Sequence, residues 1–126
     1  MKRLTEKQIK LLHKMLIEET GGCDGLRDEN LFESAINSPF QTFDGIYVYP
    51  TLERKAARLG YALICNHPFV DGNKRVGIMA MLSFLELNEI KIAYEDDDLI
   101  RIGLEIADGT MNDEQLLSWI LNHELY

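Results

Sequence analysis

Residues 67 to 75 combine side chains that suit phosphate chemistry. They read HPFVDGNKR and lead directly into an apolar stretch over 73–87 that is typical of a helix. The first four backbone N–H groups of a helix have no partner within it, and the helix dipole adds about half a positive charge at the same end. A loop that opens onto such a helix start is therefore a candidate site for an anion.

Four consecutive residues would form this anion site. Gly72 lacks a Cβ and lets an anion approach the backbone, and Asn73 begins the helix. Lys74 and Arg75 add two cations, and the planar guanidinium of Arg75 can bind a phosphate through two N–H groups at once. A polyphosphate is the ligand that fits these groups best.

Two more residues of the segment could carry out a transfer reaction. Asp71 offers a carboxylate, the kind of oxygen ligand that Mg²⁺ takes when it links a protein to phosphates. Pro68 forces His67 out of the preceding helix, which leaves the imidazole available as a general base near neutral pH. These groups predict a bound Mg-nucleotide whose phosphorus is attacked by a hydroxyl that His67 deprotonates.

On residue types alone, a second interpretation is equally open. In it the segment is an ordinary loop between helices, in which Asp71 caps a helix, residues 72–73 form a turn and residues 74–75 lie in solvent. Under the first interpretation, the apolar Phe69 anchors a working loop in the core.

Helices are the elements that must position this loop. Apolar residues at helical spacing, with caps and breakers between them, predict helices at 5–19, from Asp28 to Pro39, at 51–66, at 73–87, from 96–98 to Gly109 and from Asn112 onward. The helix over 73–87 is apolar nearly all round, so the others should pack around it. Residues 40–50 break the helical period and predict a small β-hairpin or extended flap, the only strand candidate. The fold class is all-α with one hairpin.

Composition and charge narrow the kinds of protein that this sequence could be. A length of 126 residues suits a single domain over 1–126. The net charge of −8 gathers in the C-terminal third: residues 1–85 carry a net +1 and residues 86–126 a net −9. This balance argues against binding to nucleic acid or to an anionic membrane, because both need a cationic surface. Cys23 and Cys65 have no metal-ligand spacing and no signal-peptide pattern is present, so we expect a reduced, cytoplasmic protein.

Segment 67–75 resembles the Fic-domain signature, H-P-F-x-[DE]-G-N-x-R, at every specified position. The surrounding sequence resembles the Doc (death-on-curing) branch, with GLRDENLFESAI at 25–36, ERKAARLGYALICNHPF leading into the motif and FLELNEIKI behind it. The similarity covers roughly residues 3–125. It implies a compact Fic-type helical bundle around a central helix.

The resemblance also implies roles for the residues of the motif. By position, His67 takes the family's role of base, Asp71 that of the Mg²⁺ ligand, and Phe69 that of the buried anchor. The anion hole that holds ATP, or another nucleoside triphosphate, falls on Gly72, Asn73, Lys74 and Arg75, and the last two also take part in catalysis.

Two positions depart from the members of the family that transfer nucleotides. Those members usually have Gly where this chain has Lys74, and a second Arg where it has Ile78. Doc-like proteins share both features, which implies a reversed nucleotide whose γ-phosphate is transferred to a protein hydroxyl. For Doc the target is a threonine of elongation factor Tu, and translation arrest follows.

Two alternatives to a Doc-like kinase toxin stay open. One is a nucleotidyl transferase that attaches AMP, which Lys74 and Ile78 disfavour. The other is a binding module without catalysis, which has no need of the base His67. The inhibitory pattern [ST]-x-x-x-E-[GN] of many Fic proteins has no match in the chain, so the resemblance implies restraint in trans by a small antitoxin.

The predicted flap could dock the target protein. An extended target segment would pair as an added strand with the backbone of the flap, at the flap residues Phe43, Gly45, Tyr47 and Tyr49. The alternative is a loop whose aromatic side chains seal the edge of the core.

Four other residues with reactive or ligating side chains have ordinary interpretations. His13 and His123 are expected at surface or boundary positions, because neither has a ligand partner at metal-binding spacing. Cys23 and Cys65 are expected to be small buried hydrophobic residues.

Overall fold

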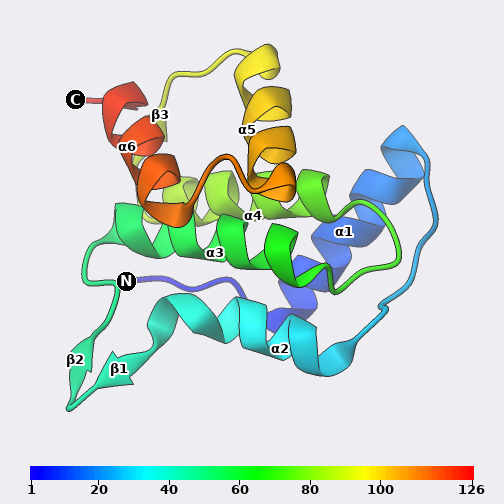
Figure 1. Cartoon of the computed structure of the whole chain (residues 1–126), viewed down its shortest axis with the longest axis horizontal. Helices are drawn as coiled ribbons and strands as arrows, with labels where there is room; N and C mark the ends of the chain where they lie inside the picture. The colour runs from blue at the N-terminus through cyan, green and yellow to red at the C-terminus, as the bar shows by residue number, and fades with distance from the viewer.

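Helices carry most of the chain, and α3 and α4 lie side by side at its centre (Figure 1). The computed structural model describes residues 1–126. Its helices are α1 (Glu6–Thr20), α2 (Glu29–Asn37), α3 (Leu52–Asn66), α4 (Asn73–Leu87), α5 (Asp96–Asp108) and α6 (Asp113–His123), with a 3₁₀ turn at Ser38–Phe40. None of them combines the length and the apolar character that a membrane span requires. The predicted all-α fold with a small hairpin is confirmed.

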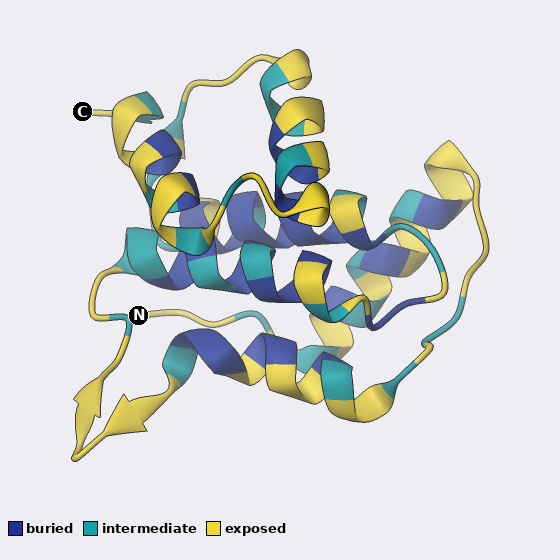
Figure 2. Ribbon diagram, in the orientation of Figure 1, coloured by how far each residue is buried: buried dark blue, intermediate teal, exposed yellow.

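The other helices pack around α4, as its sequence predicts. Nine of its 15 residues are buried, including Val76, Met81 and Phe84. α3 approaches α4 closely at Gly77, where an added Cβ would lie 2.7 Å from Cγ1 of Ile64. Figure 2 shows the buried residues concentrated along α3 and α4. This packing fixes the end of α3 against the start of α4, and with them the loop that joins the two helices.

Local hydrogen bonds explain where four of the helices begin. The side chains of Thr5 and Asn112 each accept a bond from the backbone N–H three residues later. In return, their own backbone N–H groups donate to the side chains of Gln8 and Gln115, which makes two capping boxes. Asp28 and Thr51 cap α2 and α3 in the simpler way, as acceptors alone. The predicted starts of these helices are confirmed.

The predicted hairpin is present between α2 and α3. Strands β1 (Thr42–Phe43) and β2 (Ile46–Tyr47) pair antiparallel across a turn at Asp44 and Gly45. Both turn residues have positive φ, 55° and 79°, as the tight turn of a two-residue hairpin requires.

A second pair of strands was not expected. β3 (Lys91–Ile92) pairs antiparallel with β4 (Glu124–Leu125) and joins the segment after α4 to the segment after α6. The expectation that residues 40–50 hold the only strands is therefore wrong. Strands of two residues are too short to show an alternating pattern, and their partner lies far away in the sequence.

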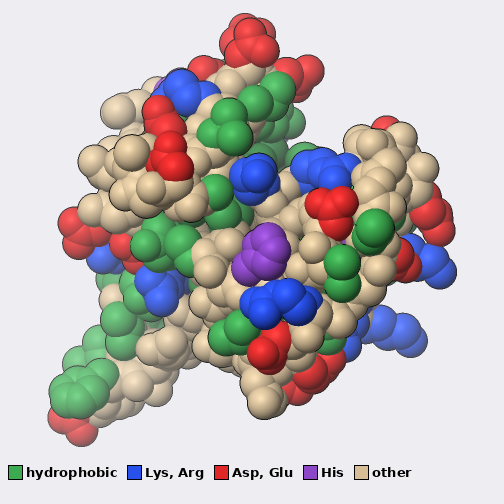
Figure 3. Space-filling view, turned by 45° about the vertical axis from the view of Figure 1, so that its right-hand side comes forward, with side chains coloured by type: hydrophobic (Ala, Val, Ile, Leu, Met, Phe, Trp, Pro, Cys, Tyr) green, Lys and Arg blue, Asp and Glu red, His purple; other side chains and the backbone are tan.

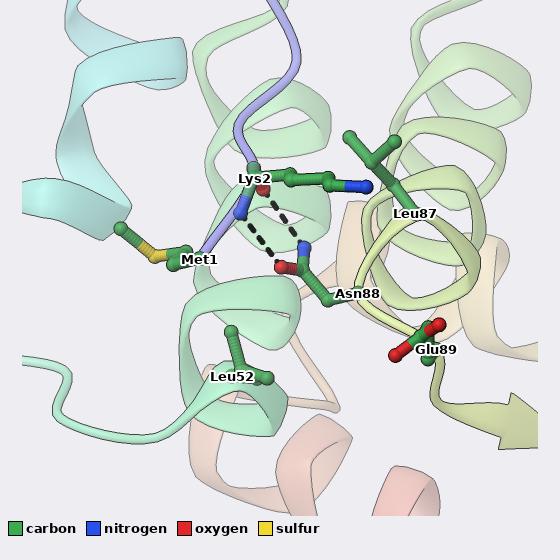
Figure 4. A pocket seen from close by; sticks show the side chains of 6 residues that line it. All are labelled: Met1, Lys2, Leu52, Leu87, Asn88 and Glu89. Atoms are coloured by element: carbon green, nitrogen blue, oxygen red, sulfur yellow. Dashed lines mark hydrogen bonds between the residues drawn. The ribbon is translucent and has the colours of Figure 1, made fainter.

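The far end of α4 holds the N-terminal segment. The side-chain amide of Asn88 accepts a bond from the N–H of Lys2 and donates one to its C=O, both at 2.8 Å, as Figure 4 shows. A cavity of about 510 Å³ beside this clamp is lined by Met1, Lys2, Leu52, Leu87, Asn88 and Glu89. α4 begins at Asn73 and spans about 22 Å at 1.5 Å per residue, so this cavity lies far from the motif.

Both cysteines lie on the surface. Cys23 is in the loop after α1 and Cys65 is in the last turn of α3, and both are exposed free thiols. The expectation that they fill the core is wrong, because Cys65 falls on the outward face of α3 while its neighbours Leu63 and Ile64 are buried.

Candidate active site

His67 stands where α3 ends. Its backbone adopts the left-handed conformation, with φ 50° and ψ 52°, and its side chain is exposed. Pro68, which follows, cannot continue the helix and is buried. The prediction that His67 leaves the helix is confirmed, and its imidazole is open to a partner from solvent.

Asn73 holds the loop closed from inside. It is only 4% exposed, and its Oδ1 accepts a bond from the N–H of Phe69 at 2.9 Å. Its Nδ2 donates to the C=O of Phe69 at 3.0 Å and to Nδ1 of His67 at 3.1 Å. Phe69 itself is 2% exposed, so it anchors the loop in the core as expected. One amide therefore links the buried anchor to the exposed imidazole.

Asn73 also decides which ring nitrogen of resting His67 carries the proton. The N–H of Phe69 can only donate, so the atom of Asn73 that faces His67 is a donor and Nδ1 must accept. The neutral resting ring then carries its proton on Nε2. To accept a proton on Nε2, the ring must first move its own proton to Nδ1 and give up this bond. A bond of this kind contributes about 1 kcal/mol, which is small beside the roughly 3–5 kcal/mol that a general base supplies.

The start of α4 is free to receive an anion. Gly72 is the N-cap with φ 79°, no side chain caps the helix, and no acidic residue lies in its first turn. Lys74 is exposed and its ammonium makes no hydrogen bond or ion pair, while its aliphatic stem lies against Gly103 of α5. Unpaired N–H groups and an unpaired cation thus face solvent beside His67.

Arg75 is partly engaged by the end of α1. One of its terminal nitrogens, Nη1, donates to the hydroxyl of Thr20 and, at 2.9 Å, to the C=O of Gly21. The other, Nη2, lies 3.9 Å from Oδ1 of Asp71. A guanidinium has five N–H donors, so Arg75 keeps free donors for a phosphate.

The carboxylate of Asp71 is oriented by the backbone. Oδ2 accepts a bond from the N–H of Cys23 at 3.3 Å, and Oδ1 accepts one from the N–H of Gly72 at 2.8 Å. These two bonds, with the nearby Arg75 guanidinium, hold the pKa of Asp71 below its ordinary value. The side chain is still 48% exposed, so its remaining lone pairs face solvent. A charged, oriented and accessible carboxylate beside a phosphate site fits the binding of Mg²⁺.

The loop after α1 reaches this carboxylate only because it contains glycine. At Gly22, φ is 119° and an added Cβ would lie 2.5 Å from Oδ2 of Asp71. From the sequence, the Gly21-Gly22 pair signals only the end of a helix. The structure shows that it also lets the loop over residues 20–25 press against the motif.

His13 is a residue of the site that sequence reasoning missed. It is 1% exposed, its Nε2 donates to the C=O of Asp71 at 2.7 Å, and its ring stacks on Phe69 at 3.8 Å between centroids. The expectation of a surface or boundary position for His13 is wrong. The missed signal is its spacing: His13 lies four residues from both Ile9 and Ile17, the buried residues of α1.

Figure 3 shows the face of the molecule around this site, where a histidine lies between Lys and Arg side chains. Of the motif residues, His67 and Lys74 are exposed, and Asp71 and Arg75 are half-buried. The structure therefore places His67, Asp71, Lys74 and Arg75 where solvent reaches them, while the buried Phe69 and Asn73 hold the loop from inside.

The predicted docking residues are not part of this cluster. The hairpin precedes the N-terminal end of α3, whereas His67 caps the C-terminal end, about 22 Å away along the helix (Figure 1). Phe43 is 79% exposed, so it does not seal the core. Tyr49 is half-buried, and its C=O accepts a bond from the buried ammonium of Lys55, which fixes the hairpin to α3.

The loop defines a class of site: an imidazole at one helix end, facing an uncapped helix start with a carboxylate and two cations. The chain belongs to the Fic/DOC family, which matches residues 3–85. Over 77 residues it is 40% identical to the protein named toxin Doc from Mycolicibacterium smegmatis, an alignment that covers 61% of this chain and 59% of that relative. The aligned part thus spans about three fifths of the relative's length. The resemblance to the Fic/Doc family is confirmed.

Replacing the carboxylate of Asp71 tests its role in binding the metal. We expect Asp71→Asn to weaken the binding of Mg-ATP by about 10–100-fold, the range typical of damaged metal sites. Binding of ATP without Mg²⁺ should not weaken, because a negative charge near the phosphates is lost. Isothermal titration with Mg²⁺ and with EDTA measures both, with Asp44→Asn in the exposed turn of the hairpin as the control. Equal affinities of variant and wild type in both conditions would leave Asp71 with a structural role only, as the acceptor of the bonds from Cys23 and Gly72.

Proposed function

We propose that the protein is a Doc-like toxin that transfers a phosphoryl group from Mg-ATP to a hydroxyl of a protein target. The observation that carries the proposal is the juxtaposition of His67 with the uncapped start of α4. The imidazole is tied to Asn73, the first residue of that helix, by a hydrogen bond of 3.1 Å. A base and an anion site are thus held together by one buried amide. The similarity to toxin Doc supports the same proposal.

The chain's own residues supply positioning and charge. The N–H groups of α4, with Lys74 and Arg75, would hold the triphosphate, and the carboxylate of Asp71 would hold Mg²⁺, which neutralises phosphate charge when bound. In the transfer, the target oxygen bonds to the γ-phosphorus and the bond from that phosphorus to the bridging oxygen breaks. The ring of His67 first moves its own proton from Nε2 to Nδ1, the hydroxyl proton then passes to Nε2, and ADP leaves.

Two positions favour phosphoryl over nucleotidyl transfer. The ammonium of Lys74 is unpaired at the first turn of α4, where it adds charge and volume to the anion site. Ile78, which replaces a second arginine, is 5% exposed and belongs to the core. The site therefore lacks the second cationic clamp that a nucleotidyl transferase of this family would use.

Intact-mass measurement separates the reactions. The protein is incubated with Mg-ATP and purified elongation factor Tu, the target that the family likeness suggests. A gain of about 80 Da on the target indicates phosphoryl transfer and a gain of about 329 Da indicates transfer of AMP. A sample with EDTA and one with the His67→Ala variant are the controls. If elongation factor Tu gains nothing, the same measurement on a cell lysate tests other targets, and no gain there favours a binding module.

The position of the hairpin limits how it could dock a target. A segment that pairs with β2 and also reaches His67 must run along α3 for about 22 Å, which takes roughly seven extended residues. The exposed Phe43 and Ile46, at 79% and 71%, would contact that segment at its far end. The hairpin as a docking site thus stays a prediction that requires a long, extended target segment.

We infer that an antitoxin would bind the apolar groove beside Arg75. This groove, of about 470 Å³, lies between the end of α1, the start of α4 and α5, and it is lined by Leu16, Thr20, Lys74, Arg75, Ile78, Met79, Asp96, Leu99, Ile100, Gly103 and Leu104. Its floor is apolar, while Lys74 and Arg75 add positive charge at one end. An amphipathic helix with an acidic residue facing Arg75 complements both features.

A surface variant in the groove tests this placement. Leu104 is 53% exposed, so Leu104→Glu should leave the fold intact but place a charge where the antitoxin packs. We expect a small protein that rescues cells from the wild-type toxin to fail against Leu104→Glu, because burying the new carboxylate is unfavourable. Leu121→Glu, at a similarly exposed position on α6, is the control. Equal rescue from all three proteins would place the antitoxin elsewhere.

A further inference from the structure

The carbonyl of His67 is held by an arginine that lies outside the motif. Nε of Arg27 donates to the C=O of His67 at 2.7 Å, and Nη2 donates to the C=O of Asn66 at 3.2 Å. The backbone around Arg27 also pairs with the motif loop: its N–H donates to the C=O of Pro68 at 2.7 Å, and the N–H of Val70 donates to the C=O of Gly25 at 3.0 Å. The guanidinium thus joins the end of α3 to a segment far away in the sequence.

The end of α3 needs such a partner. The last carbonyls of a helix receive no hydrogen bond from within the helix. The residue after the cap usually donates its N–H to one of them. Here that residue is Pro68, which has no N–H. α3 has no basic residue of its own in its last turn. Arg27 therefore satisfies two carbonyls that the local sequence leaves open.

One of these two carbonyls belongs to His67, the proposed base. His67 is a non-glycine residue in the left-handed conformation, which is unfavourable for a residue with a Cβ and persists where the surroundings hold it. We propose that Arg27 is a positioning residue for His67: by holding the C=O of His67, it fixes the backbone that places the imidazole beside the start of α4. This role rests on the proposed function, because it matters only if His67 takes part in the transfer.

Arg27 can be removed without removing the other supports of the loop. Its side chain is exposed, whereas the buried support comes from Phe69, Asn73 and His13. The backbone pairing of residues 25–27 with the loop uses main-chain atoms and survives a side-chain change. The hydrogen bonds of the guanidinium go to the carbonyls of Asn66 and His67 and not to the anion site on α4. Removal of the side chain should therefore change the orientation of His67 but preserve the fold and nucleotide binding.

Transfer kinetics of three variants test the proposal, with Mg-ATP and elongation factor Tu as substrates. We expect Arg27→Ala to lower kcat by about 10–100-fold, because a misplaced reacting group costs rates of this order. The KM for ATP should stay near wild type, and the unfolding temperature should fall only slightly, because His67 is exposed and water can replace the guanidinium at its carbonyl. Arg27→Lys should recover part of the loss, since an ammonium can still reach one carbonyl. Arg101→Ala, an exposed arginine that pairs only with Asp98 and Glu105 of its own helix, is the control.

A second measurement does not depend on activity. The nitrogen shifts of the His67 ring, recorded by NMR at a pH where it is neutral, should show one tautomer in wild type and a mixture in Arg27→Ala. If wild type transfers nothing to its target, the proposed function fails and these shifts alone decide the role of Arg27. An unchanged kcat overturns the proposal, as do unchanged ring shifts or a parallel loss of stability and nucleotide affinity.

Discussion

Replacement of His67 with alanine is expected to lower the rate of phosphoryl transfer by about 10²–10⁴-fold, the range that loss of a general base typically produces. The imidazole is exposed, and its side chain makes a single hydrogen bond, to the amide of Asn73. That amide keeps its two bonds to the backbone of Phe69 when the ring is removed. The left-handed backbone of position 67 is as unfavourable for alanine as for other residues with a Cβ, but the bonds from Arg27 that hold it do not involve the ring. We therefore expect the fold and the affinity for Mg-ATP to stay near wild type.

Single-turnover transfer and isothermal titration of Mg-ATP separate these two effects. The control is His123→Ala, which removes a histidine from α6 whose ring stacks on Trp119, away from the motif. That variant should transfer at the rate of wild type. A His67→Ala protein that also transfers at this rate would show that the proton leaves by another route, and the assignment of His67 as the base would be wrong.

The loop could be predicted from the sequence because its chemistry is local. The helix start at Asn73, the break at Pro68 and the cations that follow are consecutive, so their relation depends on a few backbone angles. The caps at Thr5 and Asn112 are local for the same reason, since each joins residues three apart. Where a feature is decided within one turn of helix, residue types and spacing suffice.

The supports of the loop could not be predicted in this way. His13, Cys23 and Arg27 reach the motif across 40 residues or more, at separations of 58, 48 and 40 positions. Which oxygen of the motif each of them meets depends on how α1 and the segment after it pack on α3 and α4. The spacing of His13 from Ile9 and Ile17 can indicate that it is buried, but no periodic pattern indicates which group of the motif it meets. The same reason explains the unforeseen pairing of β3 with β4.

The position of the hairpin can be predicted from the sequence only in part. Its turn at Asp44 and Gly45 is local and was predicted. Its distance from His67 depends on α3 running as one unbroken helix from Leu52 to Asn66, which separates two features that are close in the chain. A straight helix that connects two functional segments places them at its opposite ends.

Replacing Lys74 is expected to change which phosphorus reacts. Its ammonium is unpaired at the first turn of α4, and its stem is fixed against Gly103, so charge and volume both persist in the anion site. We expect Lys74→Gly to lower phosphoryl transfer by about 10²-fold, because a nucleotide held in another pose no longer presents its γ-phosphate to the target. Glycine in the first turn also costs up to about 1 kcal/mol of stability, which a melting curve measures.

Lys74→Met separates the charge of Lys74 from its volume. Methionine keeps most of the length of the stem without the ammonium. If charge sets the pose, Lys74→Met should behave like Lys74→Gly, and if volume sets it, Lys74→Met should keep phosphoryl transfer.

Adding the missing arginine should complete the change of reaction. We expect the double variant Lys74→Gly with Ile78→Arg to gain some nucleotidyl transfer, because the second guanidinium can clamp a triphosphate in the other pose. Ile78 is 5% exposed but also lines the groove beside Arg75, so the new side chain has a path toward solvent at some cost in stability. Mass spectrometry of a target incubated with ATP labelled differently at the α- and γ-phosphates reads out both reactions. A double variant that transfers only the γ-label at the wild-type rate would mean that Lys74 does not set the pose, and the preference for kinase chemistry would then rest on family likeness alone.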